Sequence, residues 1–357
     1  MDFTFNSFPY RVIFAHGALN RVADEAALIG KRALILSTPE QASAGRNVFA
    51  LLGPLAGGLF DRATMHVPVS IVEEALVAAK EIGADFTVAI GGGSTTGLAK
   101  ALSLRAGLPS LVIPTTYAGS EVTPIWGMTE DGIKTTGRDA GVVPRTVIYD
   151  PDLTRSLPLG MTVASGLNAI AHCMEGLYAV DGNPIVSMMA EEGIRSLYES
   201  LPRLAEDGGD DEARTQALYG CWLAGMVLGS ASVALHHKLC HTLGGRFDMP
   251  HAETHTAILP HAIAYNAPAA PDAMVRASRA MGGREPPAAL YELASKLGAE
   301  MSLAKLGMPE EGIEIAAKLA IQNPYPNPRP VTEDGIRALL ARAYTGAMPQ
   351  SAELEPA

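Results

Sequence analysis

Hydrophobic residues in the first half of the chain fall into short runs that alternate with helical patterns. Apolar spacing at i, i+3 and i+4 predicts helices over residues 71–82 and 96–105. Runs rich in aliphatic and β-branched residues predict buried strands over residues 32–37, 86–90, 111–114 and 146–149. Strands that alternate with helices are typical of a parallel sheet with both faces covered. We therefore expect an α/β domain over residues 1–155.

The pattern changes at about Pro158, after which helical spacing dominates. It predicts helices over residues 186–204 and 214–228, with residues 207–210 as the loop between them. The dipeptides Asp150-Pro151 and Leu157-Pro158 are the expected join between the two halves. We expect an all-helical domain over residues 156–357, with a frayed tail after Gln350.

Composition narrows the class of protein. With 357 residues and 48% hydrophobic content, the chain has enough apolar material for two domains. The net charge of −11 opposes binding to nucleic acid or an anionic membrane. No apolar run of about 18 residues and no signal-like start is seen. The odd set of Cys173, Cys221 and Cys240 lacks ligand spacing, which favours reduced thiols and a cytoplasmic protein.

A glycine turn follows the strand at 86–90. Residues 91–96 read Gly-Gly-Gly-Ser-Thr-Thr, so a strand, a glycine turn and a helix start follow one another. Glycines let the backbone approach a diphosphate, and the N–H groups at a helix start favour its charge. The spacing differs from GxGxxG, so it does not predict an ordinary Rossmann fingerprint.

A second loop of small hydroxyl residues follows the strand at 111–114. Residues 115–121 read Thr-Thr-Tyr-Ala-Gly-Ser-Glu. Ligands of open parallel sheets bind beyond the carboxyl ends of the strands, so the two loops are expected to flank one nucleotide.

Histidines concentrate in the helical half. Six of the nine lie between His236 and His261. His237 and His241 are four residues apart, which places both imidazoles on one helix face. Gly244-Gly245 predicts a helix stop before His251. Upstream, Asn168 and His172 form a second i, i+4 polar pair in an apolar helix, and such buried pairs converge on a site or on each other.

These residues resemble the iron-containing (group III) alcohol dehydrogenase superfamily, from Tyr10 to about Thr345. The motifs that carry the likeness are residues 91–94, 114–116, 119–121, 150–151, the helix around His172 and the block 237–261. The resemblance implies a dehydroquinate synthase-like fold. In that fold a Rossmann-like dinucleotide-binding α/β domain precedes an all-helical domain, with the active site in the cleft between them. It also implies a homodimer.

Two residues depart from the common family pattern. Most members carry an aspartate at the position of Asn168, which binds iron or zinc with histidines matching His172, His237 and His251. An amide is neutral and a weaker ligand than a carboxylate, so we expect no metal. Gly97 also stands where an aspartate is usual. Gly97, residues 235–241 and residues 327–330 all resemble the maleylacetate reductase branch.

That branch implies the NADH-dependent reduction of the C=C bond of 2-maleylacetate to 3-oxoadipate, in bacterial breakdown of aromatic compounds such as resorcinol and hydroxyquinol. Hydride addition to the alkene creates an enolate, whose charge hydrogen bonds can meet without a Lewis acid. NADPH is an alternative cofactor, because Thr38 stands where NAD-selective relatives often place an acidic residue.

The resemblance and the spacing together assign roles. We expect catalysis by His241, His237 and His251. We expect Asn168, His172, Lys238 and Arg329 to bind the substrate, the last two through its carboxylates. The expected cofactor residues are Thr38, Gly92, Gly93, Ser94, Thr95, Thr115, Thr116, Tyr117 and Ser120.

Two other functions remain open from the sequence. One is a metal-dependent alcohol or polyol dehydrogenase of the same fold, in which Asn168 still acts as a ligand. The other is a non-catalytic NAD(H)-binding sensor, which does not explain the gathering of histidines.

Overall fold

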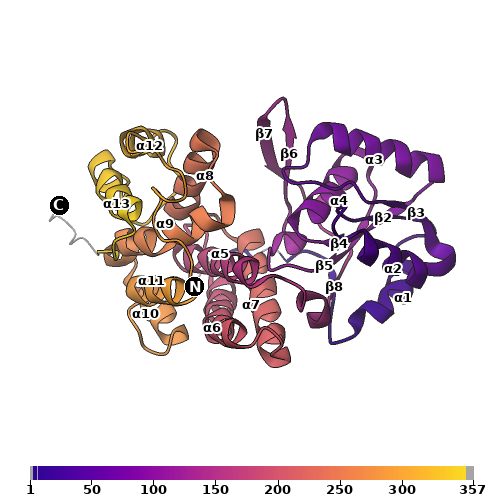
Figure 1. Cartoon of the computed structure of the whole chain (residues 1–357), viewed down its shortest axis with the longest axis horizontal. Helices are drawn as coiled ribbons and strands as arrows, with labels where there is room; N and C mark the ends of the chain where they lie inside the picture. The colour runs from indigo at the N-terminus through magenta and orange to yellow at the C-terminus, as the bar shows by residue number, and fades with distance from the viewer. Residues whose placement is uncertain (1–2, 6, 351–357) are drawn as a thin grey trace. The chain divides into compact units, whose positions relative to one another are not determined.

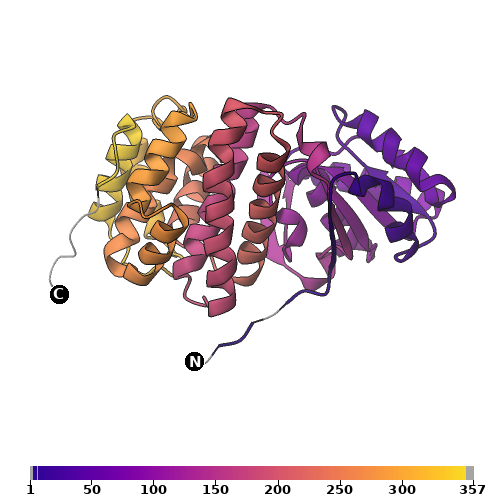
Figure 2. The same ribbon diagram turned by 90° about the horizontal axis from the view of Figure 1, so that it is seen from below.

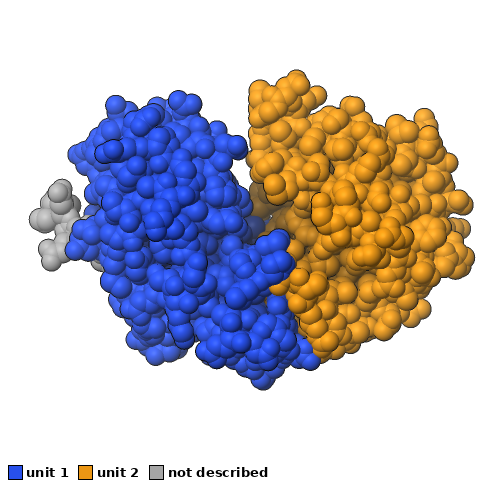
Figure 3. Space-filling view, in the orientation of Figure 1, with its two compact units in different colours: residues 1–5, 158–357 blue, residues 6–157 orange. Residues whose placement is uncertain are grey.

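The computed structural model describes residues 3–5 and 7–350, which belong to two compact units (Figure 3). One unit is Asn6–Leu157, and the other is Pro158–Ala357 together with Met1–Phe5. The change of unit after Leu157 falls at the second of the two expected Pro joins. The tail after Gln350 lies outside the described residues.

The first unit is built on one six-stranded parallel sheet (Figure 1). The strand order is β1-β8-β5-β4-β2-β3. The strands are β1 (Arg11–Phe14), β2 (Ala33–Leu36), β3 (Ala56–Phe60), β4 (Phe86–Gly91), β5 (Ser110–Pro114) and β8 (Thr146–Tyr149). The four strands predicted from the sequence are the four central ones. The two edge strands were missed, because β1 is largely accessible and β3 carries two glycines.

The faces of the sheet alternate residue by residue, so the strands β2, β4 and β5 contribute to two cores. Ile35 and Val88 pack with α1 (Val22–Ala27) and α2 (Ala42–Leu52) on one face. Leu34 and Ala89 pack with α3 (Val69–Ile82) and α4 (Gly93–Ala106) on the other. Since both faces are covered, the strands read as continuous apolar runs. The predicted α/β class with a parallel sheet is confirmed.

An antiparallel hairpin, β6 (Ile125–Glu130) and β7 (Ile133–Arg138), was not predicted. Its turn is Asp131-Gly132, where both residues have positive φ, 50° and 76°. Asp-Gly between two short runs is a strong hairpin signal. The signal was therefore present in the sequence, although its half-exposed strands gave no strong apolar pattern.

The regular secondary structure of the second unit is all helical within its described residues, as expected. Helices α5, α6 and α7 pack side by side (Figure 2). Asn183 and Asp210 cap the starts of α6 and α7 with their side chains. The helices are α5 (Leu159–Tyr178), α6 (Pro184–Glu206), α7 (Asp211–Ser230), α8 (Leu235–Phe247), α9 (His251–Asn266), α10 (Pro271–Ala280), α11 (Pro286–Lys296), α12 (Gly312–Ala320) and α13 (Glu333–Thr345).

The prediction that Gly244-Gly245 stops a helix is wrong. Helix α8 runs on to Phe247 and ends at Asp248, which adopts a left-handed φ of 52°. Glycine weakens a helix interior by only about 1 kcal/mol, and the burial of Leu239 and Leu243 against the core outweighs that cost.

Between α7 and α8 the chain turns by 92°. Within the described part of the chain no single helix is long and apolar enough to cross a membrane, and α7 with α8 reaches that composition only as this bent pair. The turn has a local consequence. It presents the first backbone N–H groups of α8 to α5, where Glu175 receives them.

Candidate functional site

The two predicted loops of the α/β unit lie against each other. A Cβ atom on Gly92 would come within 3.0 Å of Thr116, and Thr115 N donates to Gly91 O at 3.0 Å. Gly91 has a φ of 146°, and a Cβ there would meet Gln41 Oε1 at 2.5 Å. Close approach therefore requires both glycines, and the backbone of β4 and β5 forms one continuous edge.

The predicted cofactor residues fall into two groups. Gly93 is exposed at the start of α4, and Ser94 is partly exposed beside it. Thr95 is fully buried and donates its hydroxyl to Gly92 O at 2.9 Å. Tyr117 is also fully buried. Thr95 and Tyr117 therefore stabilise the loops from inside, whereas Gly93 and Ser94 lie where a phosphate could contact a helix start.

Gln41 was missed by sequence reasoning. It lies at the start of α2, and its Nε2 donates to Thr115 Oγ1 at 2.8 Å. Thr38, which is partly exposed, lies three residues earlier, after β2. The loop after β2 thus contacts the loops after β4 and β5. The sequence gave no signal for Gln41, because a lone glutamine has no characteristic spacing.

Lys100 holds the loop that follows β5. Its buried Nζ donates to the carbonyl oxygens of Ser120, Thr123 and Ile125 at 2.6, 2.9 and 2.7 Å. Burial lowers the pKa of Lys100 to about 7, and the charge of Glu121 opposes that shift. Three carbonyl acceptors need three N–H donors, which only the ammonium form supplies. Lys100 therefore fixes the segment that carries Ser120.

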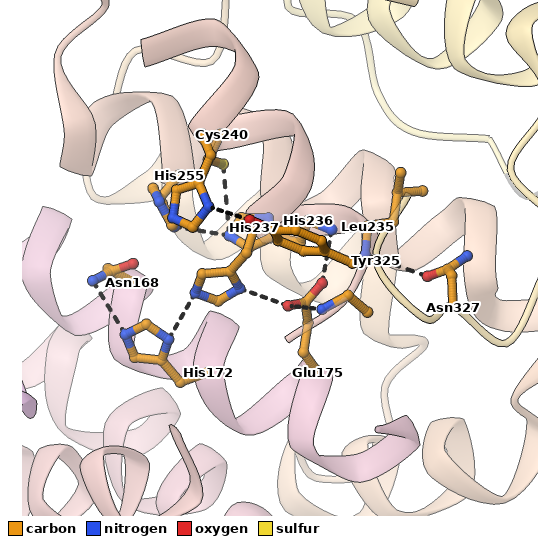
Figure 4. Close-up of polar contacts among 12 residues, drawn as sticks. Asn168, His172, Glu175, Leu235, His236, His237, Cys240, His255, Tyr325 and Asn327 are labelled. Atoms are coloured by element: carbon orange, nitrogen blue, oxygen red, sulfur yellow. Dashed lines mark hydrogen bonds and ion pairs between the residues drawn. The ribbon is translucent and has the colours of Figure 1, made fainter. Parts of the chain in front are cut away.

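In the helical unit, six histidines from α5, α8 and α9 form a continuous set of ring contacts. The ring centroids of neighbouring members lie 4.3–6.0 Å apart. Figure 4 labels four of these rings, His172, His236, His237 and His255. The members are His172, His236, His237, His241, His251 and His255. His261 is further along α9, where burial and the charge of Arg342 lower its pKa to about 4. The structure thus brings together the four histidines expected at the site, His172, His237, His241 and His251, with His236 and His255, while His261 lies apart from them.

A chain of four polar side chains runs through this set (Figure 4). Asn168 Nδ2 lies 3.4 Å from His172 Nε2, and His172 Nδ1 lies 2.9 Å from His237 Nε2. His237 Nδ1 lies 2.5 Å from Glu175 Oε2. Burial, followed by the charges of neighbouring histidines, holds the pKa of His172 and of His237 well below the usual value. Burial thus favours the neutral form of both rings.

Glu175 is the most important residue that sequence reasoning missed. It is 1% exposed, and it also accepts the backbone N–H groups of Ala234 and His236 at 2.8 and 2.7 Å. Burial raises the pKa of Glu175, while nearby His236 and the N–H groups oppose that rise. A carboxylate at a helix start is favourable, so Glu175 also stabilises the beginning of α8. Its position seven residues after Asn168 is a helical i, i+7 signal.

A buried trio of side chains lies next to this chain of four. Among the described histidine, cysteine and acidic side chains, His236, Cys240 and His255 form the group whose ligand atoms all lie within 4.8 Å of one another. His236 Nε2 already contacts His255 Nδ1 at 3.0 Å and Cys240 Sγ at 3.8 Å. Burial raises the pKa of the Cys240 thiol well above its usual value. We therefore interpret the trio as a buried, neutral, hydrogen-bonded cluster.

The exposed side of the cluster contains three more of the predicted residues, His241, His251 and Lys238. His241 and His251 are exposed, and His241 Nδ1 lies 3.1 Å from the hydroxyl of Tyr325, which was not predicted. Lys238 donates to Gln322 O at 2.9 Å and lies 5.7 Å above the Tyr325 ring.

Arg329 lies apart from the histidine chain. Its Nη1 donates to Tyr265 O at 3.1 Å, and its guanidinium stacks on the Tyr265 ring at 4.5 Å. The geometry thus ties Arg329 to α9, which does not favour its expected role in carboxylate capture. Asn327 of the same segment accepts the N–H of Leu235 at 3.3 Å and so positions the start of α8.

The residues at the family's metal positions do not fit a divalent ion as they are arranged. His237 Nε2 and His172 Nδ1 face each other at hydrogen-bond distance. One of these nitrogens therefore donates a proton and the other accepts it with the lone pair that a metal ion would need. Asn168 brings no charge, and it turns its Nδ2, a donor, toward His172. Three imidazoles and an amide would leave a dication without a compensating anion among the ligands.

Comparison with known proteins places the chain in a family. Residues 9–151 match the model of iron-containing alcohol dehydrogenases, and residues 162–344 match the C-terminal model of the same family. The chain belongs to the iron-containing alcohol dehydrogenase family and is therefore an oxidoreductase. The expectation that no metal is needed finds no support there, because the family is named for iron.

The similar sequences narrow the family to one branch. A maleylacetate reductase of Sphingobium indicum is 69% identical over 99% of this chain and 100% of its own. One of Burkholderia cepacia is 58% identical over 97% and 99%. The crystal structure of maleylacetate reductase from Agrobacterium tumefaciens has a TM-score of 0.95 at 50% identity, over 98% of this chain and 100% of its own. The predicted fold and the predicted maleylacetate reductase branch are confirmed.

Proposed function

We propose that this chain reduces the C=C bond of 2-maleylacetate with NADH and gives 3-oxoadipate, without a metal ion. The observation that carries the proposal is the hydrogen-bonded chain from Asn168 through His172 and His237 to Glu175, at the positions that the family resemblance assigns to a metal ion. The identity of 50–69% to proteins named maleylacetate reductase supports the substrate.

The reaction needs one hydride and one proton. Hydride adds to the alkene carbon β to the ketone, and the electron pair moves to the ketone oxygen, which becomes an enolate. A proton then adds to the carbon that lies between the ketone and the carbon that received the hydride, and the ketone forms again. An enolate is less basic than the alkoxide formed from a plain carbonyl, so hydrogen-bond donors suffice to stabilise it. Exposed His241, which contacts Tyr325, is suited to that task.

The loops after β2, β4 and β5 are suited to the cofactor. Gly92, Gly93 and Ser94 offer backbone N–H groups at the start of α4, and Thr116 lies against Gly92. Thr38 has no charge that would repel a 2′-phosphate. We infer that NADH is the main cofactor and that NADPH also serves.

The direct test is NADH oxidation with freshly generated maleylacetate, followed spectrophotometrically beside the same assay with NADPH. We expect turnover with both and full activity after dialysis against a strong chelator. Activity that is lost on dialysis and restored by iron or zinc would identify a metal-dependent dehydrogenase instead. NADH binding without turnover of any carbonyl compound would identify a sensor. Light scattering tests the expected homodimer.

A further inference from the structure

We infer that Asn327 is a positioning residue. Its side-chain amide holds the proline-rich segment 322–330 against α8 and α9, and so keeps the hydroxyl of Tyr325 beside His241. The positioning follows from contacts within the helical unit. Only its effect on turnover rests on the proposed function.

The amide of Asn327 makes every hydrogen bond that a primary amide can make. Its Oδ1 accepts from Leu235 N at 3.3 Å (Figure 4) and from Asn266 Nδ2 at 2.9 Å. Its Nδ2 donates to Asn266 Oδ1 at 2.7 Å and to Arg329 O at 2.7 Å. An amide group has two lone pairs on its oxygen and two N–H donors, so this side chain is fully used in joining α8, α9 and its own segment.

Backbone groups fix the direction of this amide. The N–H of Leu235 can only donate and the carbonyl of Arg329 can only accept, so Oδ1 and Nδ2 could not exchange places without losing both bonds. Asn266 is fully buried and pairs with both atoms, so the direction of its amide follows from that of Asn327. These bonds involve amide groups only, and the arrangement therefore does not depend on the protonation of any side chain.

The segment that carries Tyr325 is stiff. Residues 324, 326, 328 and 330 are all prolines, and each proline fixes its own φ near about −65°. A residue that precedes a proline is in turn restricted to extended conformations. Tyr325 and Asn327 both precede a proline. An anchor at Asn327 therefore also restricts the backbone at Tyr325, two residues away.

Asn327 joins the two parts of the chain that meet at the exposed side of the histidine cluster. The hydroxyl of Tyr325 lies 3.1 Å from Nδ1 of His241, which is on α8, and Asn327 binds the first turn of that helix. On the other side of Tyr325, Lys238 Nζ donates to Gln322 O at 2.9 Å. The segment is thus held on both sides of the tyrosine, and Asn327 supplies the anchor that does not depend on a flexible side chain.

The variant that tests this role is Asn327→Asp. It keeps an oxygen for the N–H of Leu235 but turns a second oxygen toward the carbonyl of Arg329, so it retains the helix contact and releases the segment. We expect kcat to fall by roughly tenfold, because one hydrogen bond to the active-site histidine is worth about that factor or less. The Kd for NADH should not change, since the predicted cofactor residues belong to the other unit. Full kcat in Asn327→Asp overturns the inference.

The matched control is Asn183→Asp, the same chemical change at the N-cap of α6, where the side chain only accepts hydrogen bonds. It should leave kcat and the Kd for NADH unchanged. A tenfold loss of kcat in this control as well would show that the exchange of an amide for a carboxylate in the helical unit acts unspecifically, which also overturns the inference.

A double-mutant cycle separates positioning from a general structural role. In the Tyr325→Phe background there is no hydroxyl left to position, so the addition of Asn327→Asp should lower kcat by no more than about twofold. If the two losses multiply instead, to roughly 10²-fold, Asn327 acts independently of Tyr325 and the inference is wrong.

A crystal structure of Asn327→Asp tests the positioning without any substrate. We expect the Tyr325 hydroxyl to lie beyond hydrogen-bond distance of His241 Nδ1. A variant structure that retains this contact overturns the inference. Asn327→Ala, which removes the whole amide, serves in the same way if the aspartate variant does not fold. Absence of maleylacetate turnover in the wild type contradicts only the proposed function, because crystallography still decides whether Asn327 positions Tyr325.

Discussion

His172 and His237 share a hydrogen bond of 2.9 Å and stack their rings, with centroids 4.9 Å apart and planes at 21°. The two residues are 65 positions apart in sequence and come from α5 and α8. Burial lowers the pKa of both rings well below the usual value and so favours their neutral forms. A dication at this place would have to break the pair, and it would gain no anionic ligand from Asn168.

Restoring the family's carboxylate should restore a metal site. We expect Asn168→Asp to retain about one equivalent of zinc or iron after incubation and desalting, because the new carboxylate compensates the charge of the ion. The wild type should retain none, as measured by elemental analysis. Asn183→Asp, a change at the N-cap of α6 that preserves capping, is the control. Equal metal content in the wild type and Asn168→Asp would contradict this explanation.

Tyr325 should matter to turnover through His241. Its hydroxyl lies 3.1 Å from His241 Nδ1 and holds the orientation of that exposed ring. We expect Tyr325→Phe to lower kcat by roughly tenfold, since one hydrogen bond is worth about 1.4 kcal/mol or less. The Kd for NADH should not change. Tyr291→Phe removes a hydroxyl that donates to Gly346 O elsewhere in the helical unit, and it should leave kcat as it is.

Gly97 is required by packing. A Cβ atom at this position would lie 2.7 Å from Val67 Cγ2. Glycine to alanine normally stabilises a helix, yet we expect Gly97→Ala to cost about 1–3 kcal/mol of unfolding free energy through this overlap. The double variant Gly97→Ala/Val67→Ala should recover part of the loss, as a denaturant-based mutant cycle would measure. Simple additivity of the two single changes would rule out the packing explanation.

Lys100 should be essential for the loop that carries Ser120. Lys100→Met leaves three buried carbonyl oxygens without their donor, which should lower the unfolding free energy by about 3–5 kcal/mol. NADH should also bind at least tenfold more weakly, because the loop beside the cofactor residues is no longer held. Thermal melting and NADH titration measure both effects. Lys80→Met, on the exposed side of α3, should change neither.

The buried histidines should make the protein sensitive to mild acid. Burial lowers the pKa of His172, His236, His237, His255 and His261 in the folded state, whereas the unfolded chain has a histidine pKa of about 6.5. Below that pH the unfolded state binds more protons, so stability falls as the pH falls. Each histidine contributes about 1.4 kcal/mol per pH unit until its folded pKa is reached.

The measurement is the unfolding free energy between pH 7 and pH 4.5, taken from denaturant titrations. His261→Gln, which changes a buried histidine outside the six-membered cluster, should reduce the slope by about one proton. A stability that stays constant over this range would show that these side chains are charged or solvated in the folded protein.

The central strands β2, β4, β5 and β8 and the helices of the second unit were predictable because each carries an apolar period of its own. The same holds for the pairs Asn168–His172 and His237–His241, which are one helical turn apart. Glu175 is on the same face of α5 as Asn168, and this i, i+7 spacing was the only sequence signal for it; the signal is weak, because an acidic residue in a helix is normally solvated. Gln41, Lys100 and Tyr325 act through contacts with distant segments, which no local pattern records.

The sequence by itself determined the class of protein: the glycine turn after a strand, the histidine block and Asn168 define the family and its branch. Only the tertiary structure decided which histidines meet and what they contact. Local spacing states which side chains share a helix face, but the partner of each side chain depends on what lies opposite. The turn between α7 and α8 brings two backbone N–H groups to Glu175, and the same carboxylate contacts His237, which in turn contacts His172.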